Sequence, residues 1–273
     1  MLYFIPTPIG NLSDISFRAL SILESCELLF CEDTRVSKSL IALLNAKFNT
    51  KISPKKFISL HSHNEKELLE KLDLSLFEKN VAYLSDAGMP GISDPGQLLV
   101  EFALKNNLTY EVLPGANAAL VALVSSSFCK KEFIFMGFLS SKGEKRQKDL
   151  ERLMSNPYPS IVYEAPKRIL SLLKELANLN ENKELFIIKE ISKKFQTQFK
   201  GTAKELLKEL ENANLKGEWV VVVQGDLKAE FSTNSLCEKD ILELDLPLKT
   251  KSKLLAKMSG KNPKEFYKKL VLS

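Results

Sequence analysis

Residues that commonly build metal sites and disulfide frameworks are scarce in this sequence. Its four cysteines are Cys26, Cys31, Cys129 and Cys237. They form no C-x-x-C pair, and the only two histidines, His61 and His63, have no cysteine near them. This pattern disfavours metal binding and predicts reduced thiols in a cytoplasmic enzyme.

Long apolar runs are missing as well. No run approaches the roughly 18 residues that span a membrane. The first ten residues, MLYFIPTPIG, carry no basic segment and meet Pro6 at once, so a signal peptide is not expected. A hydrophobic content of 44% and a charged content of 27% are ordinary for a soluble globular protein. A length of 273 residues predicts one large domain or two, and we expect two.

Acidic residues become rare only at the C-terminal end of the chain. From Lys249 onward there are eight lysines and one acidic residue, Glu265, although the net charge of the whole chain is only +5. The basic character is therefore local, and the rest of the chain is slightly acidic. A local basic segment predicts an appendage that binds a polyanion.

Glycine is also scarce, but it is concentrated in one place. The chain has 11 glycines and 11 prolines, and five of these residues fall within 85–96, SDAGMPGISDPG. A surface turn needs roughly two to four such residues. This segment directly follows the apolar run VAYL and is long enough to enclose a ligand.

Short apolar runs alternate with helical patterns in the first part of the chain. The expected strands here are 2–5, 28–31, 57–60, 81–85 and 110–113. Between the first two lies 14–25, where apolar residues recur at helical spacing and Ser13 or Asp14 can cap a helix. This alternation predicts an α/β sheet covered by helices.

A second series of the same kind follows the break at Pro114 and Gly115. Its expected strands are 133–137, 160–164, 184–190, 195–200 and 219–223. Beyond them, 226–240 is polar and aperiodic and predicts a linker. Two short lysine-rich helices are expected at 249–259 and 263–271.

The sequence therefore predicts two α/β domains with a cleft between them and a small helical piece at the C-terminus. We place the N-terminal domain at 1–114, the second domain at 115–230, and the linker with the lysine-rich tail at 231–273.

The chemistry of the glycine-rich segment 85–96 limits what it can bind. In a parallel α/β sheet, ligands bind beyond the carboxyl ends of the strands, where this segment begins. It has neither the G-x-G-x-x-G spacing of a dinucleotide site nor the G-K-[ST] of a P-loop, and it contains no lysine or arginine. Its backbone and Asp86 suit a neutral or cationic small molecule better. The alternative is a long turn that only connects two elements.

Five segments carry a more specific pattern. They are FIPTPIGNLSDISFRAL at 4–20, CEDTR at 31–35, SDAGMPGISDPG at 85–96, LPGANAAL at 113–120 and YEAPKRI at 163–169. In this order and spacing they resemble the ribosomal RNA small-subunit methyltransferase I family, a branch of the tetrapyrrole methylase superfamily. The resemblance runs from residue 2 to about 225, and the lysine-rich end resembles that family's C-terminal helical piece.

This resemblance implies an activity and its partners. A methyl group would pass from S-adenosylmethionine to the ribose 2′-hydroxyl of a cytidine near the decoding site of small-subunit ribosomal RNA. The substrate would be that RNA or an assembled 30S-type subunit, and the enzyme would be a homodimer without membrane or metal partners.

The resemblance also implies which residues contact the methyl donor. The matching positions are Pro8, Ser85, Asp86, Met89, Asn117, Ala118, Tyr163, Glu164, Ile191 and Val223. S-Adenosylmethionine is a sulfonium cation, and a site that offers carboxylate and carbonyl groups without lysine agrees with that charge.

Four charged residues are candidates for the chemistry. Because a ribose 2′-hydroxyl ionises far above neutral pH, a cation that stabilises developing alkoxide character would help. We predict that Lys193 is this cation and that Arg35 holds a backbone phosphate. Glu190 or Asp33 is expected to accept the proton, although Asp33 also fits the simpler role of a helix N-cap.

The residues after the third expected strand allow two interpretations. His61 or His63 is one candidate for a general base. The other interpretation assigns this stretch, which continues with Asn64 and Glu65, to helix capping and RNA contact.

Two other functions fit part of the pattern. A methyltransferase of the same fold for a tetrapyrrole or another small acceptor has no use for the lysine-rich tail. A non-catalytic RNA-binding assembly protein would use the tail but would form no product from the donor and RNA.

Overall fold

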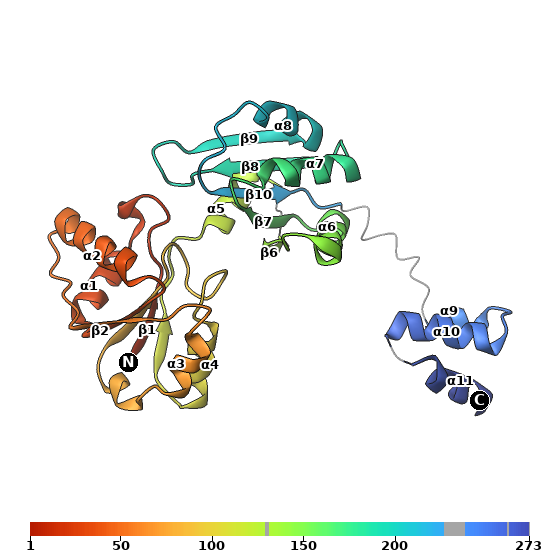
Figure 1. The fold of residues 1–273 in the computed structure, drawn as a ribbon, viewed down its shortest axis with the longest axis horizontal. Helices are drawn as coiled ribbons and strands as arrows, with labels where there is room; N and C mark the ends of the chain where they lie inside the picture. The colour runs from red at the N-terminus through yellow and green to blue at the C-terminus, as the bar shows by residue number, and fades with distance from the viewer. Residues whose placement is uncertain (129–130, 227–237, 261, 273) are drawn as a thin grey trace. The chain divides into compact units, whose positions relative to one another are not determined.

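The computed structural model describes residues 1–128, 131–226, 238–260 and 262–272. The chain forms two compact units, 1–226 and 227–273, and each is described by itself (Figure 1). Most of the predicted linker, together with Cys129 and Cys237, lies outside the described residues.

The first unit begins with a five-stranded parallel sheet in the order β3-β2-β4-β1-β5. Its strands are β1 (Leu2–Ile5), β2 (Leu28–Cys31), β3 (Lys56–Ser59), β4 (Val81–Leu84) and β5 (Tyr110–Val112). Its helices are α1 (Phe17–Ser25), α2 (Thr34–Phe48), α3 (Glu65–Glu70) and α4 (Gln97–Lys105), with 3₁₀ turns η1 (Leu12–Asp14) and η2 (Leu74–Glu78). Each predicted strand is present within one residue of its expected bounds.

Helices cover both faces of this first sheet. Apolar residues of α1 and α2 pack on one face, and those of α3 and α4 pack on the other. The loops after β1 and β2 therefore leave toward one face, whereas the loops after β3 and β4 leave toward the opposite face. Because β4 lies between β1 and β2, the direction changes on both sides of β4. Ligands bind at such switch points in open α/β sheets.

The first helix starts later than predicted. Asn11 accepts a hydrogen bond from the Ser13 N–H and opens η1, and Ser16 caps α1 by accepting from the Ala19 N–H. The apolar residues of η1 and α1 follow one helical spacing, so the sequence pattern does not show where η1 ends and α1 begins. The expected cap at Ser13 or Asp14 was therefore wrong.

A second five-stranded sheet follows in the order β6-β7-β10-β8-β9, with β6 and β7 parallel and the remaining pairs antiparallel. Its strands are β6 (Ile134–Phe138), β7 (Ser160–Glu164), β8 (Glu184–Lys189), β9 (Thr197–Thr202) and β10 (Trp219–Val223). Its helices are α5 (Ala118–Ser126), α6 (Gly143–Ser155), α7 (Ile169–Leu179) and α8 (Ala203–Leu210).

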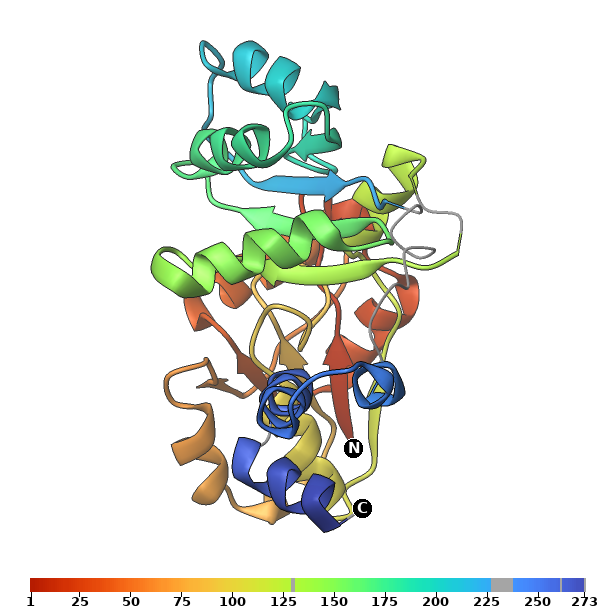
Figure 2. The same cartoon turned by 90° about the vertical axis from the view of Figure 1, so that its right-hand side faces the viewer.

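The two faces of this second sheet are buried differently. The helices α6, α7 and α8 cover one face, and α5 covers the other together with Ile9 and Ile191. Ile9 belongs to the loop after β1, so this core cluster extends across both α/β halves of the first unit. Figures 1 and 2 show the two sheets as separate layers of that unit, joined by the segment that leads into α5.

The second unit is helical among its described residues. It contains α9 (Glu238–Glu243), α10 (Leu248–Ser259) and α11 (Pro263–Leu272). The last two confirm the predicted lysine-rich helices, whereas α9 occupies the end of the predicted linker. Six lysines of α10 and α11 are exposed, namely Lys249, Lys253, Lys257, Lys264, Lys268 and Lys269. In the described part of the chain, no helix is both long and apolar enough to cross a membrane.

Candidate active site

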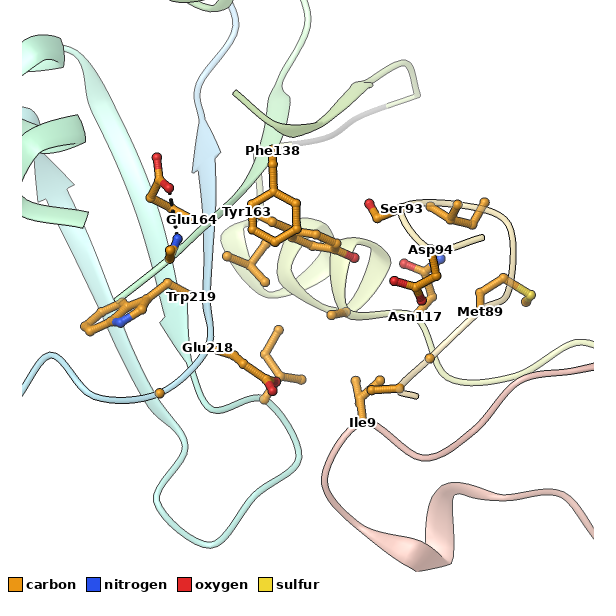
Figure 3. A pocket seen from close by; sticks show the side chains of 18 of the residues that line it. Ile9, Met89, Ser93, Asp94, Asn117, Phe138, Tyr163, Glu164, Glu218 and Trp219 are labelled. Carbon is orange, nitrogen blue, oxygen red and sulfur yellow. Dashed lines mark hydrogen bonds between the residues drawn. The ribbon is translucent and has the colours of Figure 1, made fainter. Parts of the chain in front are cut away.

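A cavity of about 360 Å³ lies where the two α/β halves of the first unit meet (Figure 3). One wall comes from Ile9 and from the loop between β4 and α4. The other walls come from the start of α5 and from the ends of three strands of the second sheet: β6, β7 and β10. The cavity is therefore at the β1/β4 switch point of the parallel sheet.

The loop between β4 and α4 is held by a dense set of backbone contacts. Thr7 and Gly88 exchange two backbone hydrogen bonds of 2.9 and 3.1 Å, which tie the loop after β1 to the loop after β4. The Ser85 hydroxyl donates to the Gly88 carbonyl at 3.2 Å, and the Gln97 amide donates to the Gly91 carbonyl at 2.6 Å. These contacts fix the shape of the loop.

Glycine is required at position 88 in this loop. Its φ of +86° is one that L side chains rarely adopt, and an added Cβ would come within 3.2 Å of Ile9 Cγ2. The concentration of glycine in 85–96 therefore serves a close approach between two loops beside the cavity.

Six of the ten residues predicted to contact the donor line this cavity. They are Met89, Asn117, Ala118, Tyr163, Glu164 and Ile191. Asn117 also caps α5 by accepting a hydrogen bond from the Leu120 N–H at 3.1 Å.

The other four residues do not line the cavity. Pro8 precedes Ile9, which does, and Ser85 is buried beneath the loop. Asp86 accepts a hydrogen bond from the Asp33 N–H at 3.1 Å and faces a separate groove. Val223 lies at the far end of β10, in the core beneath α6 to α8, whereas Trp219 and Val220 at the near end of that strand reach the cavity.

Glu164 is committed to a buried ion network. Its side chain has no solvent exposure, and its carboxylate accepts from Arg168 at 2.6 Å and from the Ala165 N–H at 2.9 Å. Arg146 lies at 3.5 Å from the same carboxylate and also pairs with Glu175. These arginines neutralise the negative charge of Glu164 within the second α/β half of the first unit.

Asp33 and Arg35 lie together in the shallow groove of about 550 Å³ that Asp86 also lines. Asp33 caps α2 through a 2.8 Å hydrogen bond from the Arg35 N–H, which confirms that it is suited to the capping role. Its carboxylate also accepts from the Arg35 guanidinium at 2.7 Å, and these hydrogen bonds lower the pKa of Asp33 to about 2. The Arg35 side chain is 89% exposed.

Lys193 and Glu190 form a tight cluster at the rim of the cavity. The Lys193 ammonium pairs with Glu190 at 2.9 Å and with Glu218 at 3.1 Å. Burial would raise the pKa of Glu190, but hydrogen bonds from the Glu218 N–H and from Lys193 outweigh it and lower that pKa. Burial likewise opposes the charge of Lys193, but its two carboxylate partners raise its pKa.

Asp94 is the most informative residue that the sequence analysis missed. It lines the cavity, and burial, followed by the charges of Glu32 and Asp86, raises its pKa to about 6, although a hydrogen bond from Ser85 opposes this rise. The segment 85–96 contains a signal for it, because the pair Ser85-Asp86 is repeated as Ser93-Asp94. Aromatic residues at strand ends, Phe138 and Trp219, were also missed.

The histidine segment acts through its neighbours. Asn64 accepts from the His61 N–H at 2.8 Å and donates to the Ser59 carbonyl at 2.9 Å, but its side chain does not cap α3. Glu65 instead caps the start of α4 by accepting from the N–H groups of Gly96 and Leu99. Neither histidine lines the cavity among the described residues.

Comparisons with known proteins agree with this architecture. The family model of Tetrapyrrole (Corrin/Porphyrin) Methylases matches residues 1–207. A protein of Campylobacter fetus named Ribosomal RNA small subunit methyltransferase I is 54% identical over 272 residues, covering 99% of this chain and 100% of that protein. The chain belongs to the ribosomal RNA small subunit methyltransferase I family. This family is part of the wider tetrapyrrole methylase family. The assignment confirms the resemblance found in the five segments.

Further relatives and solved structures support the family assignment and the fold. The protein of the same name from Helicobacter pylori strain J99 is 42% identical over 280 residues, covering 98% of this chain and 96% of that protein. The structure of uroporphyrin-III C-methyl transferase from Thermus thermophilus with S-adenyl homocysteine matches with a TM-score of 0.55 at 14% identity. It covers 84% of this chain and 99% of that chain, and at this identity it shows the fold alone.

Proposed function

We propose that this protein transfers a methyl group from S-adenosylmethionine to the ribose 2′-hydroxyl of a cytidine near the decoding site of small-subunit ribosomal RNA. The observation that carries the proposal is the similarity to named ribosomal RNA small subunit methyltransferases, which extends through the lysine-rich tail over 99% of the chain. The cavity between the two α/β halves supports it, because it lies where this fold brings ligand-binding loops together.

The cavity suits S-adenosylmethionine, which supplies a methyl group bound to a positively charged sulfur. No lysine or arginine is among the described residues that line it, whereas the carboxylates of Asp94 and Glu218 are. Its volume falls in the range of small-molecule sites, and its aromatic and aliphatic walls suit the apolar parts of such a ligand. We propose that Met89, Asn117 and Tyr163 hold the donor together with Ala118 and Ile191.

The predicted catalytic residues contribute differently from one another in this proposal. Arg35 is exposed in its groove and remains our candidate for holding a phosphate of the RNA backbone. Lys193 is still proposed as the cation near the hydroxyl, but its two carboxylate partners neutralise much of its charge. The pKa values of Asp33 and Glu190 are lowered, so each carboxylate is a weaker base and is poorly suited to accept the proton.

The second unit supports RNA as the substrate. Its exposed lysines can neutralise phosphates without depending on base sequence. We also propose that the protein works in the cytoplasm as a homodimer. The exposed apolar side chains of Val124 and Phe195, which are 80% and 74% accessible, offer surface for self-association.

Methylation assays with labelled donor test this proposal. The protein would be incubated with S-adenosylmethionine and, in parallel, with free small-subunit RNA, assembled small subunits and a porphyrinogen acceptor. We expect label on the RNA in at least one of the first two reactions. Label on the porphyrinogen and none on RNA would replace the proposed function by that of a tetrapyrrole methyltransferase.

A further inference from the structure

One aromatic residue of the cavity is exposed rather than buried. Among the described lining residues, Trp219 is 2% exposed, whereas Phe138 at the end of β6 is 58% exposed. We propose that the Phe138 ring stacks on an unpaired base of the RNA substrate. This inference rests on the proposed function and adds to it a residue that binds the methyl acceptor.

A bulge in β6 turns Phe138 toward the cavity. Phe135 pairs with Ile161 of β7 and Phe138 pairs with Tyr163, so β6 contains one extra residue between the two pairs. Gly137 lies at this bulge and has a φ of +62°. Because side chains alternate between the faces of a strand, Phe135 and Phe138 would face opposite sides without the bulge. The extra residue places both on the side of Tyr163, which lines the cavity.

Tyr163 orients the Phe138 ring. The two ring centroids are 5.6 Å apart with an interplanar angle of 67°, which is an edge-to-face geometry. Figure 3 shows Phe138 beside Tyr163, across from the loop that carries Ser93 and Asp94. The ring is therefore held in place by a neighbour while more than half of the residue stays open to a ligand.

A second exposed apolar side chain lies on the opposite segment. Ile92, in the loop between β4 and α4, lines the cavity and is 50% exposed. This loop approaches the end of β6, because an added Cβ at Gly137 would lie 3.6 Å from Ser93 Oγ. Phe138 follows Gly137 and Ile92 precedes Ser93, so both belong to the place where the two segments meet. An aromatic and an aliphatic side chain in one opening suit a flat ring such as a nucleobase.

Exposed lysines follow the same strand ends. Lys142 and Lys145 come after β6, and Lys167 follows Pro166, which lines the cavity. All three lysines are exposed, and in the described part of the chain none of them forms an ion pair. Positive charge beside an aromatic ring is the combination by which proteins bind single-stranded nucleic acid.

The lysines favour one source of the stacked base over the other. The methyl donor also carries a base, its adenine, but it has no phosphate. RNA combines each base with a phosphate that a lysine can neutralise. We therefore assign the ring of Phe138 to a base of the RNA.

This role has a consequence for the form of the substrate. A base within a duplex is covered on both sides by its neighbours, whereas a base in a loop can turn out onto an aromatic side chain. Every base has a flat face, so Phe138 would add affinity for an unpaired nucleotide without selecting its identity.

Steady-state methylation at saturating donor tests the role of Phe138. The substrate is whichever of free RNA and assembled small subunits the wild-type protein labels. Phe138→Leu keeps an apolar side chain and removes the ring, and it should raise the KM for RNA about fivefold or more, the lower end of what one stacked base contributes. The kcat should change by less than about threefold, since the ring holds the RNA equally in the ground state and the transition state. Donor affinity, measured by calorimetry, should also stay within about threefold of wild type.

Matched variants keep the test interpretable. Phe138→Tyr retains the ring and should keep a KM for RNA near that of wild type. Phe17→Ala removes another exposed phenylalanine, at the start of α1 and outside the cavity lining, and should leave KM, kcat and donor affinity unchanged. Thermal unfolding shows whether each variant is folded. If Phe138→Leu is not, Phe138→Met takes its place, since it also lacks a ring.

Three results would overturn the inference. The first is a KM for RNA in Phe138→Leu within about twofold of wild type. The second is a loss of donor affinity as large as the rise in KM, which would assign the ring to the adenine of the donor. The third is an equal rise of KM in Phe138→Leu and Phe138→Tyr, which would mean that the ring is not what binds RNA.

Failure of this inference can be told from failure of the proposed function. Wild-type protein that labels no RNA would refute the proposed function itself. RNA methylation with an unchanged KM in Phe138→Leu would refute only the role of Phe138.

Discussion

Gly88 shows how one residue controls the shape of the cavity. Its positive φ and the 3.2 Å approach to Ile9 leave no room for a branched side chain. We expect Gly88→Val to weaken S-adenosylmethionine binding at least tenfold, a loss of about 1.4 kcal/mol, because it displaces the loop that lines the site. Calorimetric titration measures this loss.

Gly143 provides the matched control for this substitution. It also has a positive φ, of +75°, but an added Cβ there would meet nothing within 4 Å. Gly143→Val should therefore carry a similar backbone strain and leave donor affinity unchanged. Equal donor affinity in Gly88→Val and wild type would show that the loop is not part of the donor site.

Asp94 should also make stability depend on pH. Its pKa is raised from 3.8 to about 6 on folding, so the stability it contributes is intact below about pH 4 and is lost as pH rises through 6. Asp94→Asn removes this loss, which is about 1 kcal/mol once solvent screening of a partly exposed group is allowed for.

Thermal unfolding at two pH values measures this effect. The melting temperature of Asp94→Asn should exceed that of wild type by about 2–4 °C at pH 7.5, and the two should coincide near pH 4. A variant that melts at or below the wild-type temperature at pH 7.5 would show that the carboxylate is not strained by its surroundings.

The element scale explains which parts of the fold the sequence could predict. Strands β1, β2, β7 and β10 have the predicted bounds, because each is an apolar run that polar or turn-forming residues enclose. The start of α1 could not be placed by periodicity, since the 3₁₀ turn before it continues the same apolar spacing. Helix α9 was missed because 238–243 is short and mostly charged.

The candidate site was predictable to the level of loops and less so to the level of side chains. Strand ends and glycine-rich turns identified the loops, and six of the ten donor positions line the cavity. The predicted donor contact of Val223 was wrong, because sequence alone does not tell which end of an antiparallel strand faces the cavity. Glu164 pairs with Arg168 four residues on, which a local pattern could suggest, but its second partner, Arg146 of α6, could not be found from the sequence.

The contact between the loop after β1 and the loop after β8 can be tested by one substitution. An added Cβ at Gly10 would lie 2.4 Å from Lys193 Cγ and 2.9 Å from the Ile191 carbonyl oxygen. We expect Gly10→Val to push the 190–193 loop away from the loop after β1. Donor binding should weaken at least tenfold, because Ile191 lines the cavity. Unchanged donor affinity by calorimetry would mean that this contact does not shape the site.

On the scale of the whole molecule, we expect the first unit to bind the donor and the second to bind RNA. The cavity is built entirely from residues of the first unit, whereas the exposed lysines of α10 and α11 belong to the second. Deleting 249–273 should leave donor affinity unchanged and weaken RNA binding. The slope of log K against log salt should become shallower by roughly 0.7–0.9 for each phosphate that the shortened protein no longer neutralises.

A milder variant separates charge from helix packing. Lys264, Lys268 and Lys269 changed together to Gln keep α11 while removing three exposed charges. Their salt slope should lie between those of wild type and the deletion. A salt slope that both variants leave unchanged would mean that the tail serves dimerisation or packing.

The position of the transferred methyl group tests the central claim most directly. Small subunits that lack this modification would be incubated with the protein and S-adenosylmethionine, and their RNA would then be cleaved in alkali. A 2′-O-methyl group removes the hydroxyl that alkaline cleavage requires, so the account predicts one new resistant linkage, on the 3′ side of a cytidine. A methyl group found on a base, with every linkage still cleaved, would contradict it.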